Sequence, residues 1–216
     1  MSFKFEIIDD FISSEDSYQL IEYFSDKLSP SNVIGNSYLR NSDDFYIELE
    51  SLQNKKIQDI LSNIKIKISN ISNIPIENQE LFTIIRYKEG QHFKPHFDAF
   101  HDYDDFEVED LLGGQRLKTF IICLKSSKKG GETKFEKLDK EIKLENNQCI
   151  YWDNVDKNGN LYTQSLHSGL SPEIGEKWIL TCWIREKKYY ALDRNIAKKI
   201  IENYSKQILI NTLESL

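Results

Sequence analysis

The chain has 216 residues, with 28 Lys and Arg against 35 Asp and Glu, which gives a formal net charge of −7 and a pI of about 5.2. An acidic chain without basic runs does not suit general binding to nucleic-acid phosphates or anionic membranes, because both depend on clustered Lys and Arg. Hydrophobic residues make up 39% and aromatic residues 12%, which is enough for a packed core and too much for a disordered chain. We therefore expect a single domain over residues 1–216, with neither nucleic acid nor membrane as a partner.

The N-terminal region, residues 1–80, is expected to form a strand and supporting helices. Ser13 and Asp16 have the spacing of a capping box, and the apolar residues that follow recur at helical spacing, which predicts a helix over 13–28. A second helical pattern covers 48–68. The first ten residues contain no long apolar stretch, so they do not indicate a secretory signal.

The middle region, residues 81–186, consists of short runs rich in β-formers and bounded by Gly, Asn, Asp and Pro. Strands with turn signals between them predict an antiparallel sandwich or barrel, of which the jelly roll is the eight-stranded form. No helical pattern lies between the runs, which argues against a parallel sheet. The runs are LFTIIRY, HFKPHFD, KTFIICL, ETKF, EIKL, QCIYWD, QSLHS and KWILTCWIRE.

The C-terminal region, residues 187–216, is helical again and carries an apolar stripe. This stripe either packs on the rest of the chain or forms a homodimer contact, because exposed apolar stripes often mark interfaces. Its members are Ile196, Ile200, Ile201, Tyr204 and Ile208.

The three cysteines, Cys123, Cys149 and Cys182, lie far apart inside apolar, strand-like runs. An odd number of such residues indicates buried free thiols in a reducing compartment, and neither a disulfide framework nor a zinc site. We therefore expect the protein to be cytoplasmic.

His96 and Asp98 are the first residues that suggest chemistry, because alternate residues of a strand point to the same face. His167 lies in a second strand-like run. Two His and one carboxylate that leave open positions are typical of non-haem Fe(II) sites that activate oxygen. A structural zinc site would need a fourth ligand, which His92 or His101 could supply.

Lys177 opens the last predicted strand, ten residues after His167. Alternation puts Lys177, Ile179, Thr181 and Trp183 on one face, so the ammonium group could point into the barrel. A buried Lys is costly unless it meets an anion, and a dicarboxylate co-substrate is one candidate.

Five ordered motifs between about Ile85 and Glu186 resemble the prolyl 4-hydroxylase-like 2-oxoglutarate- and Fe(II)-dependent dioxygenases. The N-terminal run FEIIDDFISSEDSYQLI also looks like the opening strand and helix of that family. The fold implied is α+β and mainly β, a double-stranded β-helix (jelly-roll) core with supporting N-terminal helices and a C-terminal helix. The motifs are RYKEGQHFKPHFD, GGQRLKTFIICL, GGETKF, SLHSG and GEKWILTCWIRE.

The resemblance implies a role for each matching residue. His96, Asp98 and His167 would be the iron ligands. Lys177 would pair with the C5 carboxylate of 2-oxoglutarate, helped by the hydroxyls of Tyr87 and Thr133. Trp183 would line the co-substrate pocket, and Arg116 would lie near the peptide substrate.

The activity implied is hydroxylation of peptidyl proline in proline-rich or collagen-like sequences, with O₂ consumed, succinate and CO₂ released, and ascorbate protecting the iron. The alternatives are the same chemistry on a lysyl residue, a free amino acid or a nucleic-acid methyl group. A metal- or carbohydrate-binding β-sandwich without turnover is the alternative from another class.

The segment His101–Asp110 carries six acids in ten residues. Such a segment is expected to be a solvated, mobile lid. Alternatively, it attracts a basic peptide substrate through Asp102, Asp104 and Asp105.

Overall fold

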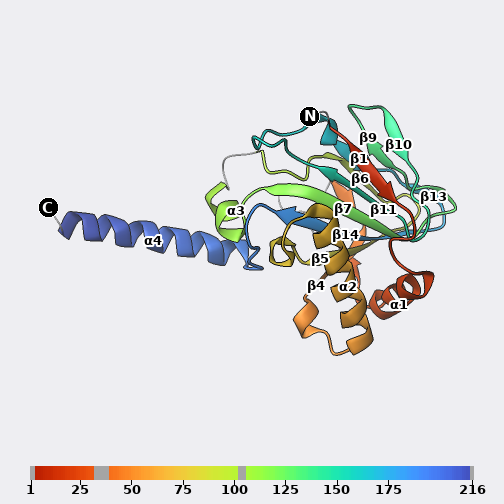
Figure 1. Cartoon of the computed structure of the whole chain (residues 1–216), viewed down its shortest axis with the longest axis horizontal. Coiled ribbons are helices and arrows are strands. Elements are labelled where there is room, and N and C mark those ends of the chain that lie inside the picture. Colours follow the sequence, from red (N-terminus) through yellow and green to blue (C-terminus); the bar gives the residue numbers. More distant parts are fainter. Residues whose placement is uncertain (1–2, 32–38, 102–105, 215–216) are drawn as a thin grey trace.

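Two antiparallel sheets that face one another form the centre of the computed structural model, which describes residues 3–31, 39–101 and 106–214 (Figure 1). The large sheet has the order β1 (Phe5–Ile8), β11 (Cys149–Asp153), β7 (Arg116–Lys125), β14 (Lys177–Arg185), β5 (Phe82–Tyr87), β4 (Asp43–Ile47) and β2 (Ser29–Pro30). The small sheet has the order β10 (Lys140–Ile142), β9 (Thr133–Phe135), β12 (His167–Gly169), β6 (His92–His96) and β3 (Arg40–Asn41). A further pair joins β13 (Pro172–Ile174) to β8 (Lys129–Gly130). The arrangement confirms the predicted jelly roll.

Alternation along β14 divides the buried residues into two cores. Trp178, Leu180 and Ile184 face the helices and join the core beneath the large sheet. Ile179 faces the small sheet and belongs to the core between the two sheets. The strand therefore presents its other face to the interior of the jelly roll, as its sequence pattern predicts.

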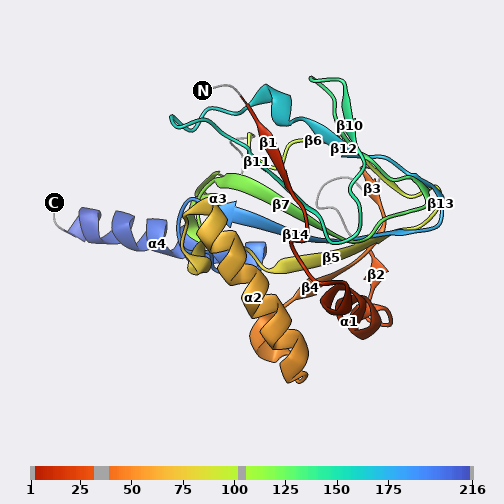
Figure 2. The ribbon, with the colours of Figure 1, turned by 45° about the vertical axis from the view of Figure 1, so that its right-hand side comes forward.

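The helices α1 (Ser14–Phe24) and α2 (Lys55–Ser72) lie against the outer face of the large sheet (Figure 2). The Ser13 side chain accepts the backbone N–H of Asp16 at 3.0 Å, which confirms the predicted N-cap of α1. The second helix starts later than predicted, because Asn54 caps it by accepting from the Ile57 N–H. The 3₁₀ turns of the chain are η1 (Leu49–Ser51), η2 (Ile76–Asn78) and η4 (Thr163–Ser165).

The segment between α1 and α2 differs from the sequence-based prediction, which assigned no strand there. It contributes β2, β3 and β4, and β4 pairs with β5 along its whole length. Only Phe45, Tyr46 and Ile47 of β4 are apolar, so the local sequence pattern does not predict a strand. The strand forms because it pairs with β5.

The acidic segment His101–Asp110 is only partly what the sequence suggested. Residues 102–105, which include Asp102, Asp104 and Asp105, lie outside the described residues. From Phe106 the chain forms the helix α3 (Phe106–Leu112), and Glu109 is 4% exposed. The prediction of a solvated lid is therefore wrong for this half of the segment, because α3 packs on the C-terminal helix.

The C-terminal helix α4 (Arg194–Glu214) projects away from the two sheets (Figures 1 and 2). Its first turns pack on α3 through Ala197 and Ile201. Ile196, Ile200 and Tyr204 are exposed. None of the helices within the described ranges combines the length and apolar character that crossing a membrane would require.

All three cysteines are buried and free, in agreement with the sequence-based prediction. Burial raises the pKa of the Cys123 thiol to about 11. Such thiols are packing residues that resist deprotonation.

Candidate active site

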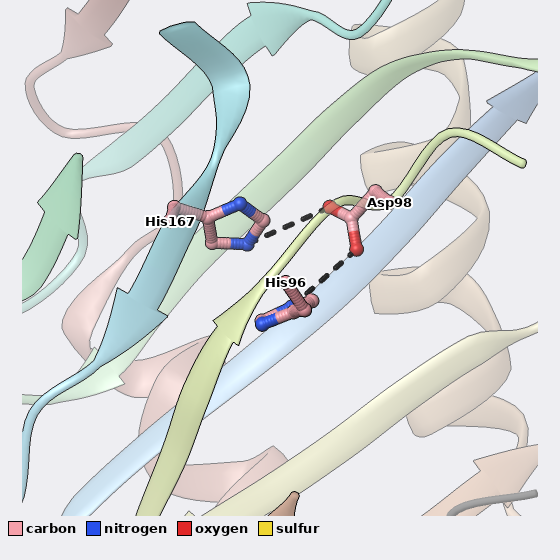
Figure 3. Close-up of side chains that lie close together, drawn as sticks. All are labelled: His96, Asp98 and His167. Carbon is pink, nitrogen blue, oxygen red and sulfur yellow. Dashed lines mark ion pairs between the residues drawn. The ribbon is translucent and has the colours of Figure 1, made fainter. Parts of the chain in front are cut away.

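Three side chains converge at the junction of β6 and β12 (Figure 3). The two strands pair with His167 directly opposite His96, and Asp98 follows two residues after the end of β6. Asp98 Oδ1 lies 3.7 Å from His96 Nε2, and Asp98 Oδ2 lies 3.7 Å from His167 Nε2. One donor atom from each residue lies within 4.8 Å of the others, which is close enough for one metal ion to contact all three.

Backbone carbonyl groups fix the orientation of both imidazole rings. His96 Nδ1 donates to the carbonyl of Lys94 at 2.8 Å, and His167 Nδ1 donates to the carbonyl of Ser165 at 2.9 Å. With Nδ1 acting as donor, each neutral ring presents the lone pair of Nε2 toward Asp98. A hydrogen bond of this kind is what a metal-ligating His usually makes through its other nitrogen.

A chain of hydrogen bonds fixes the carboxylate of Asp98. The Thr119 hydroxyl donates to Asp98 Oδ2 at 2.6 Å, and Asn154 Nδ2 donates to the Thr119 oxygen at 2.9 Å. The indole of Trp152 donates to Asn154 Oδ1 at 2.9 Å. All four residues are buried, so the carboxylate has one preferred orientation.

The electrostatic environment favours an anionic Asp98 carboxylate beside a neutral His96 imidazole. Burial, reinforced by the neighbouring His167, holds the pKa of His96 well below its usual value. Burial alone would raise the pKa of Asp98, but both imidazoles, Arg116 and the Thr119 hydroxyl outweigh it, so this pKa is lowered. Both shifts favour the protonation states in which these groups bind a cation.

The donor set of two imidazoles and one carboxylate fits Fe(II) and leaves coordination positions open. The structure does not bring His92 or His101 into the cluster: within the described residues, the group able to hold a metal contains only His96, Asp98 and His167. A closed four-ligand zinc site therefore does not fit these residues.

Lys177 lies on the wall of the pocket that contains these donor atoms. It is 5% exposed, and its ammonium group makes no hydrogen bond or ion pair with any residue that the structure describes. Burial lowers the pKa of Lys177 to about 8. A buried cation without a partner is costly, so an anionic ligand at this end of the pocket would stabilise it.

Gly131 lies beside the side chains of Lys177 and Ser127. Its φ is +78°, and a Cβ atom there would lie 2.7 Å from the Ser127 hydroxyl and 3.5 Å from Lys177 Cδ. Both the backbone conformation and the close approach therefore require glycine in the GGET motif.

The other predicted pocket residues lie where alternation and strand pairing put them. Tyr87 stands opposite Lys177 in the β5–β14 register, and Tyr87, Thr133 and Trp183 all line the pocket. Burial raises the pKa of Tyr87 to about 12, so its hydroxyl remains a hydrogen-bond donor. The buried Thr181 Oγ1 and Trp183 Nε1 have no hydrogen-bond partner among the described residues, and because both residues line the pocket, a bound ligand would be able to supply one.

Arg116, for which the resemblance implies a position near the peptide substrate, is not among the residues that line this pocket. Its guanidinium group forms a two-point ion pair with Glu80, at 2.6 and 2.8 Å. It also lies 4.0 Å from the ring centroid of Trp183. Burial alone would lower the pKa of Arg116, but Glu80 raises it above its usual value.

Sequence reasoning missed Arg40, which lines the pocket from β3. Arg40 is buried, forms an ion pair with Asp44, and its Nε has no hydrogen-bond partner in the described part of the chain. The supporting residues Thr119 and Asn154 were missed as well. The scarcity of arginine was an available signal, since all five arginines of the chain form ion pairs with Asp or Glu.

The sequence profile of the 2OG-Fe(II) oxygenase superfamily matches residues 82–185. Probable prolyl 4-hydroxylase 6 of Arabidopsis thaliana is 30% identical over 199 residues, with 83% of this chain and 68% of the relative covered. Probable prolyl 4-hydroxylase 7 of the same plant is also 30% identical, and here the chain spans only 61% of the relative.

Among solved structures, viral collagen prolyl hydroxylase from Paramecium Bursaria Chlorella virus-1, in its complex with 2OG, superposes with a TM-score of 0.64. It is 28% identical, and the match covers 84% of this chain and 95% of that one. A Pseudomonas putida prolyl-4-hydroxylase superposes with a TM-score of 0.57 at 14% identity, which supports the fold alone.

Proposed function

The chain belongs to the prolyl 4-hydroxylase-like 2OG-Fe(II) oxygenases, and from this premise we propose that it is a 2-oxoglutarate- and Fe(II)-dependent prolyl 4-hydroxylase. Its substrates would be peptidyl prolines in proline-rich or collagen-like sequences. The observation that carries the proposal is the pocket in which His96, Asp98 and His167 share one cavity with the unpaired Lys177. We further propose that residues 1–216 act as one catalytic domain.

His96, Asp98 and His167 would hold the iron. Bound Fe(II), together with 2-oxoglutarate and O₂, supplies the oxidising power that hydroxylates a C–H bond and converts 2-oxoglutarate to succinate and CO₂. The chain contributes rigid ligands, because the carbonyls of Lys94 and Ser165 orient the imidazoles and Thr119 orients the carboxylate. Ascorbate would restore iron oxidised in turnovers without substrate hydroxylation.

Lys177 would bind the C5 carboxylate of 2-oxoglutarate, and the hydroxyls of Tyr87 and Thr133 would donate to the same group. The apolar side chains of Ile85 and Ile179 line the same pocket and keep water from the co-substrate stem. Trp183 would complete the pocket toward the peptide. Because Arg116 is paired with Glu80, it would act on the peptide side by holding the Trp183 ring.

The C-terminal helix supports a second part of the proposal, a homodimer. Ile196, Ile200 and Tyr204 are exposed on a helix that projects from the sheets, and most of the stability of helices in proteins comes from tertiary packing of an apolar face. Light scattering should give twice the mass of one chain. A monomeric mass at micromolar concentration would contradict the dimer.

Mass spectrometry of peptides tests the catalytic proposal. Proline-rich and collagen-like peptides are incubated with the protein, Fe(II), 2-oxoglutarate and ascorbate, with boiled protein as the control. We expect one added oxygen on proline and one succinate per oxygen. Oxidation of a lysyl residue or a free amino acid would identify another substrate of the same chemistry, and no succinate with any substrate would contradict the activity.

A further inference from the structure

Five charged side chains form a cluster beside the pocket, which we call the ion cluster: Glu80, Glu109, Arg116, Arg185 and Arg194. Arg185 is 1% exposed and lies at its centre. Arg185 Nη1 donates to Glu80 at 3.2 Å, and its Nη2 donates to the Glu109 carboxylate at 2.9 Å. Glu80 also holds Arg116, and Glu109 also holds Arg194 of α4. The two carboxylates therefore divide three guanidinium groups between them.

The ion cluster reaches the pocket through the ring of Trp183. The Arg116 guanidinium lies 4.0 Å from the centroid of the Trp183 ring, and Trp183 lines the pocket. The centroid of the Phe100 ring lies 5.1 Å from Arg116 Cζ and 4.7 Å from Arg185 Cζ, so both guanidinium groups contact the same ring. Phe100 follows Asp98 by two residues. The backbone N–H of Phe100 donates to Gln115 Oε1, and Gln115 Nε2 donates to the carbonyl of Phe100, each at 2.8 Å.

Glu109 has no direct contact with Trp183: it reaches this ring only through Arg185, Glu80 and Arg116. Its carboxylate and its backbone carbonyl both accept from Arg185 Nη2, at 2.9 and 3.0 Å. Without the charge of Glu109, Arg185 would keep only one carboxylate partner among its ion pairs, Glu80, which it shares with Arg116. Arg185 would then compete with Arg116 for Glu80, since buried cations demand a carboxylate.

We propose that Glu109 is a positioning residue for peptide binding: by pairing with Arg185 it reserves Glu80 for Arg116, which fixes the Trp183 ring on the pocket wall. The helices α3 and α4, which carry Glu109 and Arg194, thereby influence peptide binding although neither residue lines the pocket. This inference rests on the proposed function only for its kinetic part. The geometric part is measurable in the protein without metal or substrate.

Glu109→Gln keeps the shape of the side chain and removes its charge. Its matched control is Glu107→Gln, which changes an exposed acid on the same helix. We expect the tryptophan emission of Glu109→Gln to shift to longer wavelength, because a displaced Arg116 leaves the Trp183 ring open to water. The shift should be absent when Glu109→Gln is made in a Trp183→Phe background. Glu107→Gln should behave as the wild type.

In turnover, Glu109→Gln should raise the peptide KM about tenfold, with kcat and the 2-oxoglutarate KM within about twofold of wild type. Arg194→Gln provides the opposite charge change. Glu109 then pairs with Arg185 alone, so the peptide KM should equal or fall below that of the wild type. A destabilised fold would move both variants in the same direction.

The proposal is overturned if Glu109→Gln melts at lower temperature but keeps wild-type tryptophan emission and peptide KM. If Glu109→Gln does not fold, Arg194→Gln carries the test, and a raised peptide KM in that variant contradicts the proposal. Absence of turnover in every protein would contradict the proposed function, whereas the emission shift would still support or refute the positioning role.

Discussion

Buried polar groups differ in their pairing between the interior of the pocket, called the inner side, and the ion cluster beside it, called the outer side. On the inner side, Lys177, Thr181 Oγ1 and Trp183 Nε1 have no hydrogen-bond partner among the described residues. On the outer side, Arg116 and Arg185 form ion pairs with Glu80 and Glu109. Unpaired buried groups are costly, so the ones that line the pocket mark where a ligand would complete the structure. The ion-paired side chains support the wall, although Arg185 Nε also has no hydrogen-bond partner in the described part of the chain. The comparison predicts that inner substitutions alter 2-oxoglutarate binding, whereas outer ones alter stability or peptide binding and leave 2-oxoglutarate binding near the wild-type value.

The largest effect is expected from His167→Ala. Removing one of three metal ligands should reduce peptide hydroxylation on the order of a thousandfold, because metal-ion catalysis contributes several kcal/mol. Metal content after dialysis and succinate formation measure the loss. The control is His92→Ala, which removes an imidazole from the same small sheet outside the metal-binding group. Equal losses in both variants would contradict the assignment.

Glu80→Gln tests the outer side. The substitution leaves Arg116 and Arg185 with less compensating charge, so the free energy of unfolding should fall by about 3 kcal/mol, measured by urea denaturation. The affinity for 2-oxoglutarate of the folded protein should remain near the wild-type value. A stable variant with weakened 2-oxoglutarate binding would reverse the distinction between the two sides.

Lys177→Met should give the inverse pattern. The Kd for 2-oxoglutarate should rise about hundredfold, because truncating a buried charged partner costs about 2 to 5 kcal/mol. The ligand-free protein should melt at a higher temperature, because the unpaired buried cation is gone. Lys94→Met, at an exposed position of β6, should change neither quantity. A lower melting temperature with unchanged Kd would mean that Lys177 has a structural partner.

The pH dependence of 2-oxoglutarate binding should give the smallest effect. The pKa of Lys177 in the free protein is lowered to about 8, so the cation is present below this pH and is lost above it. The Kd should therefore rise about tenfold between pH 7 and pH 9. Anaerobic calorimetry with Mn(II) in place of Fe(II) measures it. Lys177→Arg, which stays charged, should abolish the change, and an identical rise in that variant would assign the titration elsewhere.

Local motifs explain why the inner side could be predicted from the sequence. His96 and Asp98 lie two residues apart, and the alternation along β14 predicted which face would carry Lys177 and Trp183. The roles of the site residues and the single-domain organisation stay predictions. The same holds for the cytoplasmic location, the dimer and the acidic loop at 102–105.

The outer side could not be predicted because its contacts join distant segments. Glu80 and Arg116 are 36 positions apart, and Glu109 and Arg194 are 85 apart. No periodicity encodes such pairs. Arg40 was missed for a related reason: its two-residue strand forms only by pairing with β6. Long-range pairing also explains why α3 is a helix with a buried Glu109 where the composition indicated a solvated loop.

Anaerobic absorption spectroscopy tests most directly whether this pocket holds Fe(II) and 2-oxoglutarate together. Adding both to the metal-free protein should produce a visible metal-to-ligand charge-transfer band. Its intensity should saturate at one iron and one 2-oxoglutarate per protein chain. The band should be absent in His96→Ala and should require much more 2-oxoglutarate in Lys177→Met. A wild-type protein that binds Fe(II) but gives no band at saturating 2-oxoglutarate would contradict the account.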